Sequence, residues 1–136
     1  MTPRMVEQFG FTRGAILAGA IWAAWHMPLL LFADYNSATE WWFAFSCFTV
    51  MVVASSVILT WLRLRSNSVW PCMLFHASHN VFIQSFFTPL TGARGKITPY
   101  IVDEFGVGVP LVVLVIAILA WRARDQIRDQ IRTVSP

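Results

Sequence analysis

The chain has 136 residues, of which 57% are hydrophobic and only 12% charged, with a net charge of +3, and its mean hydropathy is +0.59. Soluble domains carry about 25% charged residues, and a globule this small could not hide seven Trp and eleven Phe from water. Composition therefore excludes a disordered chain, a nucleic-acid-binding module and an ordinary cytosolic domain, and it indicates a membrane protein.

Four stretches of the chain contain no Asp, Glu, Lys or Arg. A helix needs about 20 mostly apolar residues to cross a bilayer, and its backbone polar groups must be satisfied within the helix. The sequence thus predicts an all-α, polytopic membrane helix bundle. Its four transmembrane helices are expected at about 14–33, 41–62, 67–87 and 105–121.

Basic residues are distributed unequally between the two sides of these helices. Eight lie before the first helix, between the second and third, or after the fourth, and only Arg94 and Lys96 lie on the other side. Because Lys and Arg favour the cytoplasmic side, both termini are expected in the cytoplasm. Nine Arg against one Lys suggests a bacterial source, and the expected location is the cytoplasmic (inner) membrane.

The segments between and beside the predicted spans have simple interpretations. Residues 1–14 are polar enough to approach the membrane along its interface, and the first span is expected to end near Pro28, which lacks a backbone donor. Ser55 and Ser56 are small enough for close helix contact. Asn67 and Ser68 are candidate N-cap residues of the third span.

After the third span, residues 88–106 are expected to form a loop that contains several Pro and Gly. Residues 107–136 comprise the last helix and a basic cytoplasmic tail. Together with the preceding helices they are expected to form a single membrane domain, residues 1–136.

The predicted spans contain three His and one Asn, and ionisable residues in a bilayer are candidates for function. His26 lies roughly 18 Å from the start of the first span, and His76 roughly 13–14 Å from the start of the third, at 1.5 Å per residue. Both are counted from the same side, so they can meet near mid-membrane. Asn80 is four residues after His76 and shares its helix face.

These groups favour two kinds of chemistry. His26 and His76 could hold a divalent metal such as zinc, or His26, His76 and Asn80 could donate hydrogen bonds to a developing oxyanion. No nucleophile and no carboxylate accompany these residues. An alternative to an enzyme is a small transporter that uses the same His residues to carry metal ions or protons. His79 could flank the site or form a hydrogen bond to another helix.

Residues 19–32, GAIWAAWHMPLLLF, resemble one motif of the CPBP family, the type II CAAX-processing and bacteriocin-processing (Abi) intramembrane proteases. In that family a helix often ends in a Trp-x-x-Trp-His-x-Pro pattern. Here the pattern is formed by Trp22, Trp25, His26 and Pro28.

Residues 67–82, NSVWPCMLFHASHNVF, resemble the family's last motif, His-x-x-x-Asn/Asp preceded by Trp-Pro. The match places His76 and Asn80 on the motif and leaves His79 in a variable position. The resemblance covers about residues 5–85, the CPBP-like core.

The resemblance implies an intramembrane endopeptidase, metallo- or glutamic in type, that hydrolyses membrane-associated peptides or proteins from a cavity within a helix bundle. His26, His76 and Asn80 would be its catalytic residues, and His26 and His76 would bind a metal if one is present. In the family, a Glu-Glu-x-x-x-Arg motif supplies the base that activates water.

This sequence lacks that motif, because Glu7 and Arg13 are single and six residues apart. The expectation is a truncated chain that is inactive alone, whose partners besides the lipid bilayer would be the missing N-terminal helices or another chain. The alternative is a non-enzymatic remnant of the family that acts in bacteriocin self-immunity or as an assembly partner.

Overall fold

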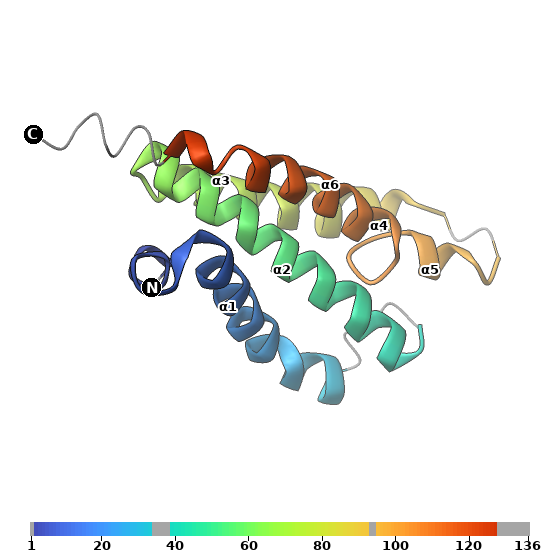
Figure 1. Ribbon diagram of the computed structural model, residues 1–136. Helices are drawn as coiled ribbons and strands as arrows, with labels where there is room; N and C mark the ends of the chain where they lie inside the picture. Colours follow the sequence, from blue (N-terminus) through green and yellow to red (C-terminus); the bar gives the residue numbers. More distant parts are fainter. Residues whose placement is uncertain (1, 34–38, 93–94, 128–136) are drawn as a thin grey trace, which may run out of the picture.

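The structure is a computed structural model that describes residues 2–33, 39–92 and 95–127. All regular secondary structure in these ranges is helical, which confirms the all-α class (Figure 1). The segment 34–38 that joins the first two spans, the basic residue Arg94 and the tail beyond residue 127 lie outside the described residues.

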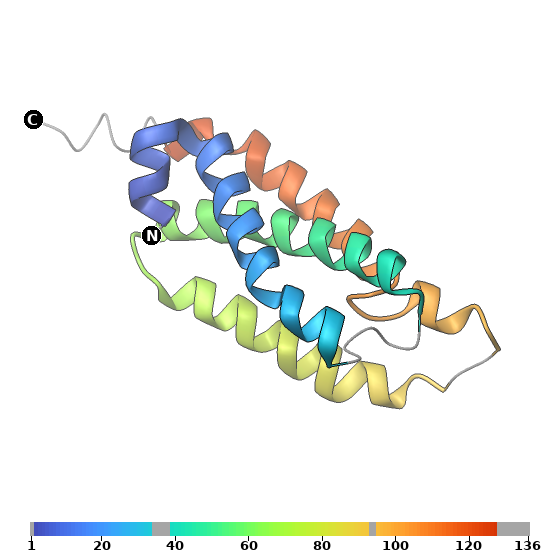
Figure 2. The same cartoon turned by 90° about the horizontal axis from the view of Figure 1, so that it is seen from below.

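Two helices are long and apolar enough to cross a membrane, α1 (Thr2–Phe32) and α2 (Trp41–Ser66). The backbone of α1 is not helical at Gly10 (φ 78°, ψ 168°), so residues 2–9 form a separate segment that folds back on the longer part (Figure 2). The end of α1 at Phe32 agrees with the expected span of 14–33, and Pro28 does not end the helix. Proline removes the hydrogen bond of its own nitrogen and its ring crowds the carbonyl four residues earlier, which membrane helices tolerate where neighbouring groups compensate.

The third predicted span is one continuous helical segment of mixed type. It consists of α3 (Trp70–Ser78), the π-helix η1 (His79–Phe87) and α4 (Thr88–Leu90). Its length of about 30 Å, at roughly 1.5 Å per residue, equals the thickness of a bilayer's hydrocarbon core. The predicted N-cap at Asn67 was wrong, because Asn67 adopts a left-handed conformation (φ 49°) and ends α2. The hydroxyl of Ser68, the other candidate, accepts a hydrogen bond of 3.3 Å from the backbone nitrogen of Trp70, the first residue of α3.

The fourth predicted span is shorter in the structure. The expected loop at 88–106 contains α4 and the short helix α5 (Thr98–Ile101), and α6 covers Gly108–Arg122. Within the described ranges only α1 and α2 have the length and hydropathy of a span. The count of four spans and the cytoplasmic termini therefore stay predictions.

Helix α2 lies at the centre of the fold and packs against α1, α6 and α3 (Figures 1 and 2). Its inward face supplies much of the core, including Phe48 and Val52. Large apolar side chains cover the outside as well: Trp25 is 80% exposed and Phe32 86% exposed. Apolar surface on this scale is unfavourable in water and suits lipid contact, in agreement with the membrane assignment from composition.

Helices α1 and α2 cross at a point where α1 has no side chain. A Cβ atom added at Gly19 would lie 2.8 Å from the Cα atom of Val53. Close by, the Ser56 hydroxyl donates a hydrogen bond of 2.9 Å to the carbonyl oxygen of Ala15. The expected role of Ser56 in close helix contact is thus confirmed, and the crossing fixes where α1 presents its histidine.

We expect Gly19→Val to weaken this crossing, because the backbone of α2 would have to move to admit the new side chain. Overpacking of this kind costs about 1–3 kcal/mol, so the melting temperature in detergent should fall by several degrees. Gly92→Val is the matched control, since a Cβ at Gly92 meets nothing within 4 Å. Equal melting temperatures for the two variants would contradict a tight crossing at Gly19.

Candidate active site

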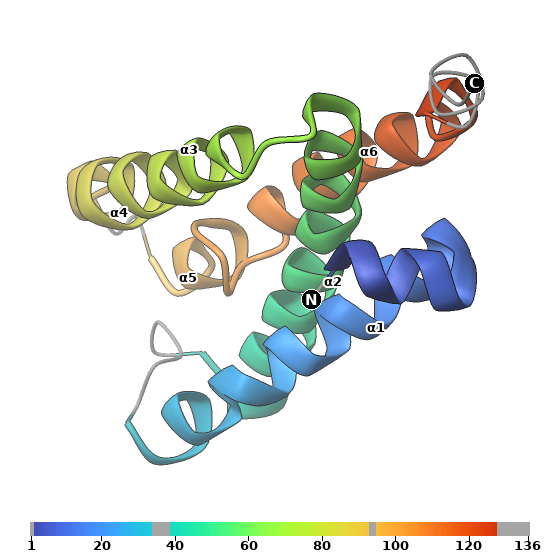
Figure 3. The same cartoon turned by 90° about the vertical axis from the view of Figure 1, so that its left-hand side faces the viewer.

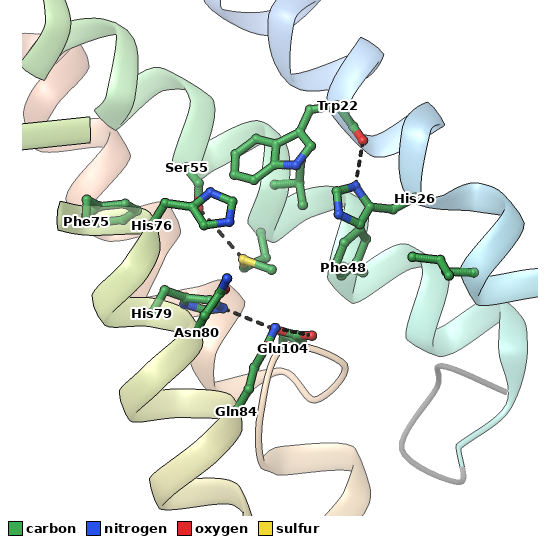
Figure 4. A pocket seen from close by; sticks show the side chains of 13 residues that line it. Trp22, His26, Phe48, Ser55, Phe75, His76, His79, Asn80, Gln84 and Glu104 are labelled. Carbon is green, nitrogen blue, oxygen red and sulfur yellow. Dashed lines mark hydrogen bonds and ion pairs between the residues drawn. The ribbon is translucent and has the colours of Figure 1, made fainter. Parts of the chain in front are cut away.

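A cavity of about 180 Å³ lies between α1, α2, the α3–η1 segment and the loop that precedes α6. Figure 3 shows the α3–α4 segment and the C-terminal part of α1 extending to the same side of α2, with the α5 region between them. The three predicted site residues, His26, His76 and Asn80, all line this cavity (Figure 4). Its other polar lining residues are Ser55, His79, Gln84 and Glu104.

His26 is held from two sides. Its Nδ1 atom lies 2.9 Å from the carbonyl oxygen of Trp22, one turn earlier in α1. A carbonyl oxygen only accepts hydrogen bonds, so Nδ1 carries the proton and Nε2 of a neutral His26 has a free lone pair. The ring also packs against Phe48 of α2, with centroids 5.3 Å apart. His26 is therefore a preoriented acceptor.

His76 is oriented by the same tryptophan. Its ring stacks on the indole of Trp22, with centroids 5.3 Å apart and planes inclined by 24°. The ring of His26 lies 6.2 Å from the same indole. Trp22 thus contacts both imidazoles and positions α1 against α3. Asn80, the second residue of η1, lines the same cavity four residues after His76.

The π-helix η1 begins at His79, within the site. Its hydrogen bonds join residues five apart instead of four, and the side chain of Ser85 also bonds to the carbonyl oxygen of Asn80 at 3.2 Å. This wider winding brings His79 and Gln84 to one face, where both contact the same partner. Short π-helical segments within α-helices occur frequently at functional sites.

That partner is Glu104, from the loop between α5 and α6. The Nε2 atom of His79 donates to Oε2 of Glu104 at 3.1 Å, and the amide of Gln84 donates to Oε1 at 3.0 Å and to Oε2 at 2.8 Å. Glu104 is only 2% exposed and ranks among the most deeply buried large side chains in the described chain. The interpretation that the site lacks a carboxylate was therefore wrong.

Sequence reasoning missed Glu104 because it assigned residues 88–106 to a plain connecting loop. The only available signal was its position, directly before an uncharged stretch. A charged residue at such a point is most simply explained as lying in solvent. The contact with His79 joins residues 25 positions apart, and no helical spacing predicts it.

The predicted metal site has less support in this geometry. The tautomer of His26 suits a metal ligand, but no group of three His, Cys, Asp or Glu side chains lies close enough to share a metal ion in the described part of the chain. Among residues 2–33, 39–92 and 95–127, His26 and His76 therefore have no third ligand of these types, and the divalent metal stays a prediction.

Comparison with protein families matches residues 1–82 to the Rce1-like family, described as type II CAAX prenyl endopeptidase. The match includes both motifs identified above, with His26, His76 and Asn80, and it ends before Glu104. Neither the curated proteins nor the solved structures gave a significant match. Since the family match covers more than half of the sequence, the chain belongs to the Rce1-like family of membrane-embedded type II CAAX prenyl endopeptidases.

Proposed function

We propose that this cavity hydrolyses peptide bonds of membrane-associated peptides, in the manner of a CAAX-type intramembrane endopeptidase. The observation that carries the proposal is the meeting of His26, His76 and Asn80 in one cavity. They come from two helices far apart in sequence, and all three lie in the part of the chain that matches the family.

The hydrogen bonds of the site suggest a different role for each residue. His26 offers an acceptor at Nε2 and would hold the attacking water. His76 and the amide of Asn80 would donate hydrogen bonds to the oxygen of the scissile carbonyl as negative charge develops there. Preoriented donors in a site with little water typically accelerate such reactions by about 10²–10³-fold each.

The remaining walls of the cavity suit a lipid-bearing substrate. Apolar side chains line much of it, among them Leu29, Met51 and Phe75. A peptide anchored in the bilayer could enter from lipid without exposing its apolar part to water. The family's name, type II CAAX prenyl endopeptidase, supports a substrate with a prenylated cysteine before the cleaved bond.

Cleavage of a defined peptide by the purified chain in liposomes tests the proposal. The probe is an internally quenched CAAX peptide with a prenylated cysteine, and the same peptide without the lipid is the comparison. We expect a rise in fluorescence with the prenylated peptide, and mass spectrometry should place the cut after the modified cysteine.

A His26→Ala, His76→Ala double variant, prepared identically, controls for contaminating proteases. Equal rates for this variant and the wild type would show that the cavity is not the site of cleavage. If the wild type cleaves neither peptide, the proposal is wrong.

A further inference from the structure

Glu104 lies outside the 82 residues that match the family, so no family motif accounts for its position. Its side chain, from the loop between α5 and α6, nevertheless lines the cavity of the predicted site (Figure 4). A buried carboxylate is costly unless hydrogen bonds compensate it. An apolar residue of similar size would often be at least as stable in such a place.

Backbone geometry and a hydrogen bond stabilise the conformation of the loop around Glu104. Asp103, directly before it, adopts a left-handed backbone (φ 61°), which Asp tolerates better than most residues. Its Oδ1 atom accepts a hydrogen bond of 2.8 Å from the backbone nitrogen of Phe105. The residues on both sides of Glu104 are therefore joined to each other.

Phe105 anchors the same loop to the wall of the site. Its ring stacks on Phe48, with centroids 5.8 Å apart and planes inclined by 18°, and Phe48 also contacts the ring of His26. At Gly106 a Cβ atom would lie 2.5 Å from the carbonyl carbon of Ile101, so only glycine permits this folding of the loop. The orientation of the Glu104 side chain therefore depends on the same packing that positions His26.

His79 and Gln84 complete the arrangement. Their three hydrogen bonds fix both carboxylate oxygens and stabilise the charged form of Glu104. The carboxylate borders the cavity that His26, His76 and Asn80 also line, so acceptors from α1 and from the α5–α6 loop face the same cavity.

We propose that Glu104 is the general base of this site, and that His79 and Gln84 position its carboxylate. The proposal rests on the proposed function above. It supplies a base in a sequence that has no Glu-Glu-x-x-x-Arg motif.

In the proposed step, water gives one proton to a carboxylate oxygen of Glu104 and donates its other hydrogen to Nε2 of His26. The water oxygen bonds to the scissile carbonyl carbon, and the carbonyl electron pair moves to its oxygen, facing His76 and Asn80. When this intermediate collapses, the carbon–nitrogen bond breaks and the nitrogen takes the proton from Glu104. The products are a carboxylic acid and an amine.

Three variants of the full chain in liposomes test the proposal on the prenylated peptide. Glu104→Gln keeps the size of the side chain and one acceptor oxygen, but its NH2 group replaces the other acceptor and it cannot take the proton. Glu104→Ala leaves room for formate as an external carboxylate. Glu7→Gln is the matched control, because Glu7 is exposed in the first segment of α1.

We expect both Glu104 variants to lose at least about 100-fold in rate, within the range for general bases, while they stay folded at the assay temperature. Formate should restore part of the rate to Glu104→Ala only, and Glu7→Gln should match the wild type. A Glu104→Gln variant within a few-fold of the wild-type rate would overturn the inference but leave the proposed function standing. If both variants lose their rate because they unfold at the assay temperature, and formate restores none of it, Glu104 is structural and the inference is also overturned. An inactive wild type would overturn the proposed function itself.

Discussion

His26→Ala and His76→Ala should each lower kcat/KM for the prenylated peptide by about 10²–10³-fold, equal to about 2.7–4 kcal/mol of transition-state stabilisation. His26 would lose the acceptor that holds water, and His76 a donor to the developing oxyanion. Residues that act as a unit have strongly non-additive effects. The kcat/KM of the double variant should therefore be little lower than that of either single variant. Independent effects would instead multiply the two losses in kcat/KM.

Two matched alanine substitutions separate this effect from general damage to the helices. Trp25→Ala lies beside His26, and Leu74→Ala lies two residues before His76, and both native side chains are exposed on the apolar exterior. Both controls should keep rates near that of the wild type. If either single His variant stays within a few-fold of the wild type, or if the two losses multiply, His26 and His76 do not act on one reaction centre.

Much of the site could be predicted from sequence because its residues lie on regular helices. Charge-free stretches indicated where helices run, and a rise of 1.5 Å per residue placed His26 and His76 at similar depth. The spacing of four residues placed Asn80 beside His76. The structure brings all three to one cavity, while their catalytic roles stay predictions.

What could not be predicted depends on irregular backbone. The π-helix at His79–Phe87 changes which residues share a face, and nothing in its apolar sequence distinguishes it from an α-helix. As a result His79, which belonged to no motif, gained a defined partner. Glu104 reaches that partner through a left-handed Asp103 and a tight glycine turn, features set by tertiary contacts and not by periodicity.

Gly106→Ala should lower kcat/KM by about 10²-fold although every polar group of the site remains. The new Cβ would lie 2.5 Å from backbone atoms of Ile101 and Val102, which are not flexible side-chain ends, so the loop must shift. Glu104 lies two residues earlier and would move with it. Misplacement of a reacting group by about 1 Å can cost this much in rate, and steady-state kinetics on the prenylated peptide measures the loss.

Gly92→Ala is the control, because a Cβ at Gly92 meets nothing within 4 Å. Formate separates a displaced base from a missing one: it should help Glu104→Ala, where the carboxylate is gone and space is left, but not Gly106→Ala, where the carboxylate is present and misdirected. If Gly106→Ala keeps the wild-type rate, the orientation of the Glu104 carboxylate does not matter for catalysis. Its burial would then serve only to tie the α5–α6 loop to η1.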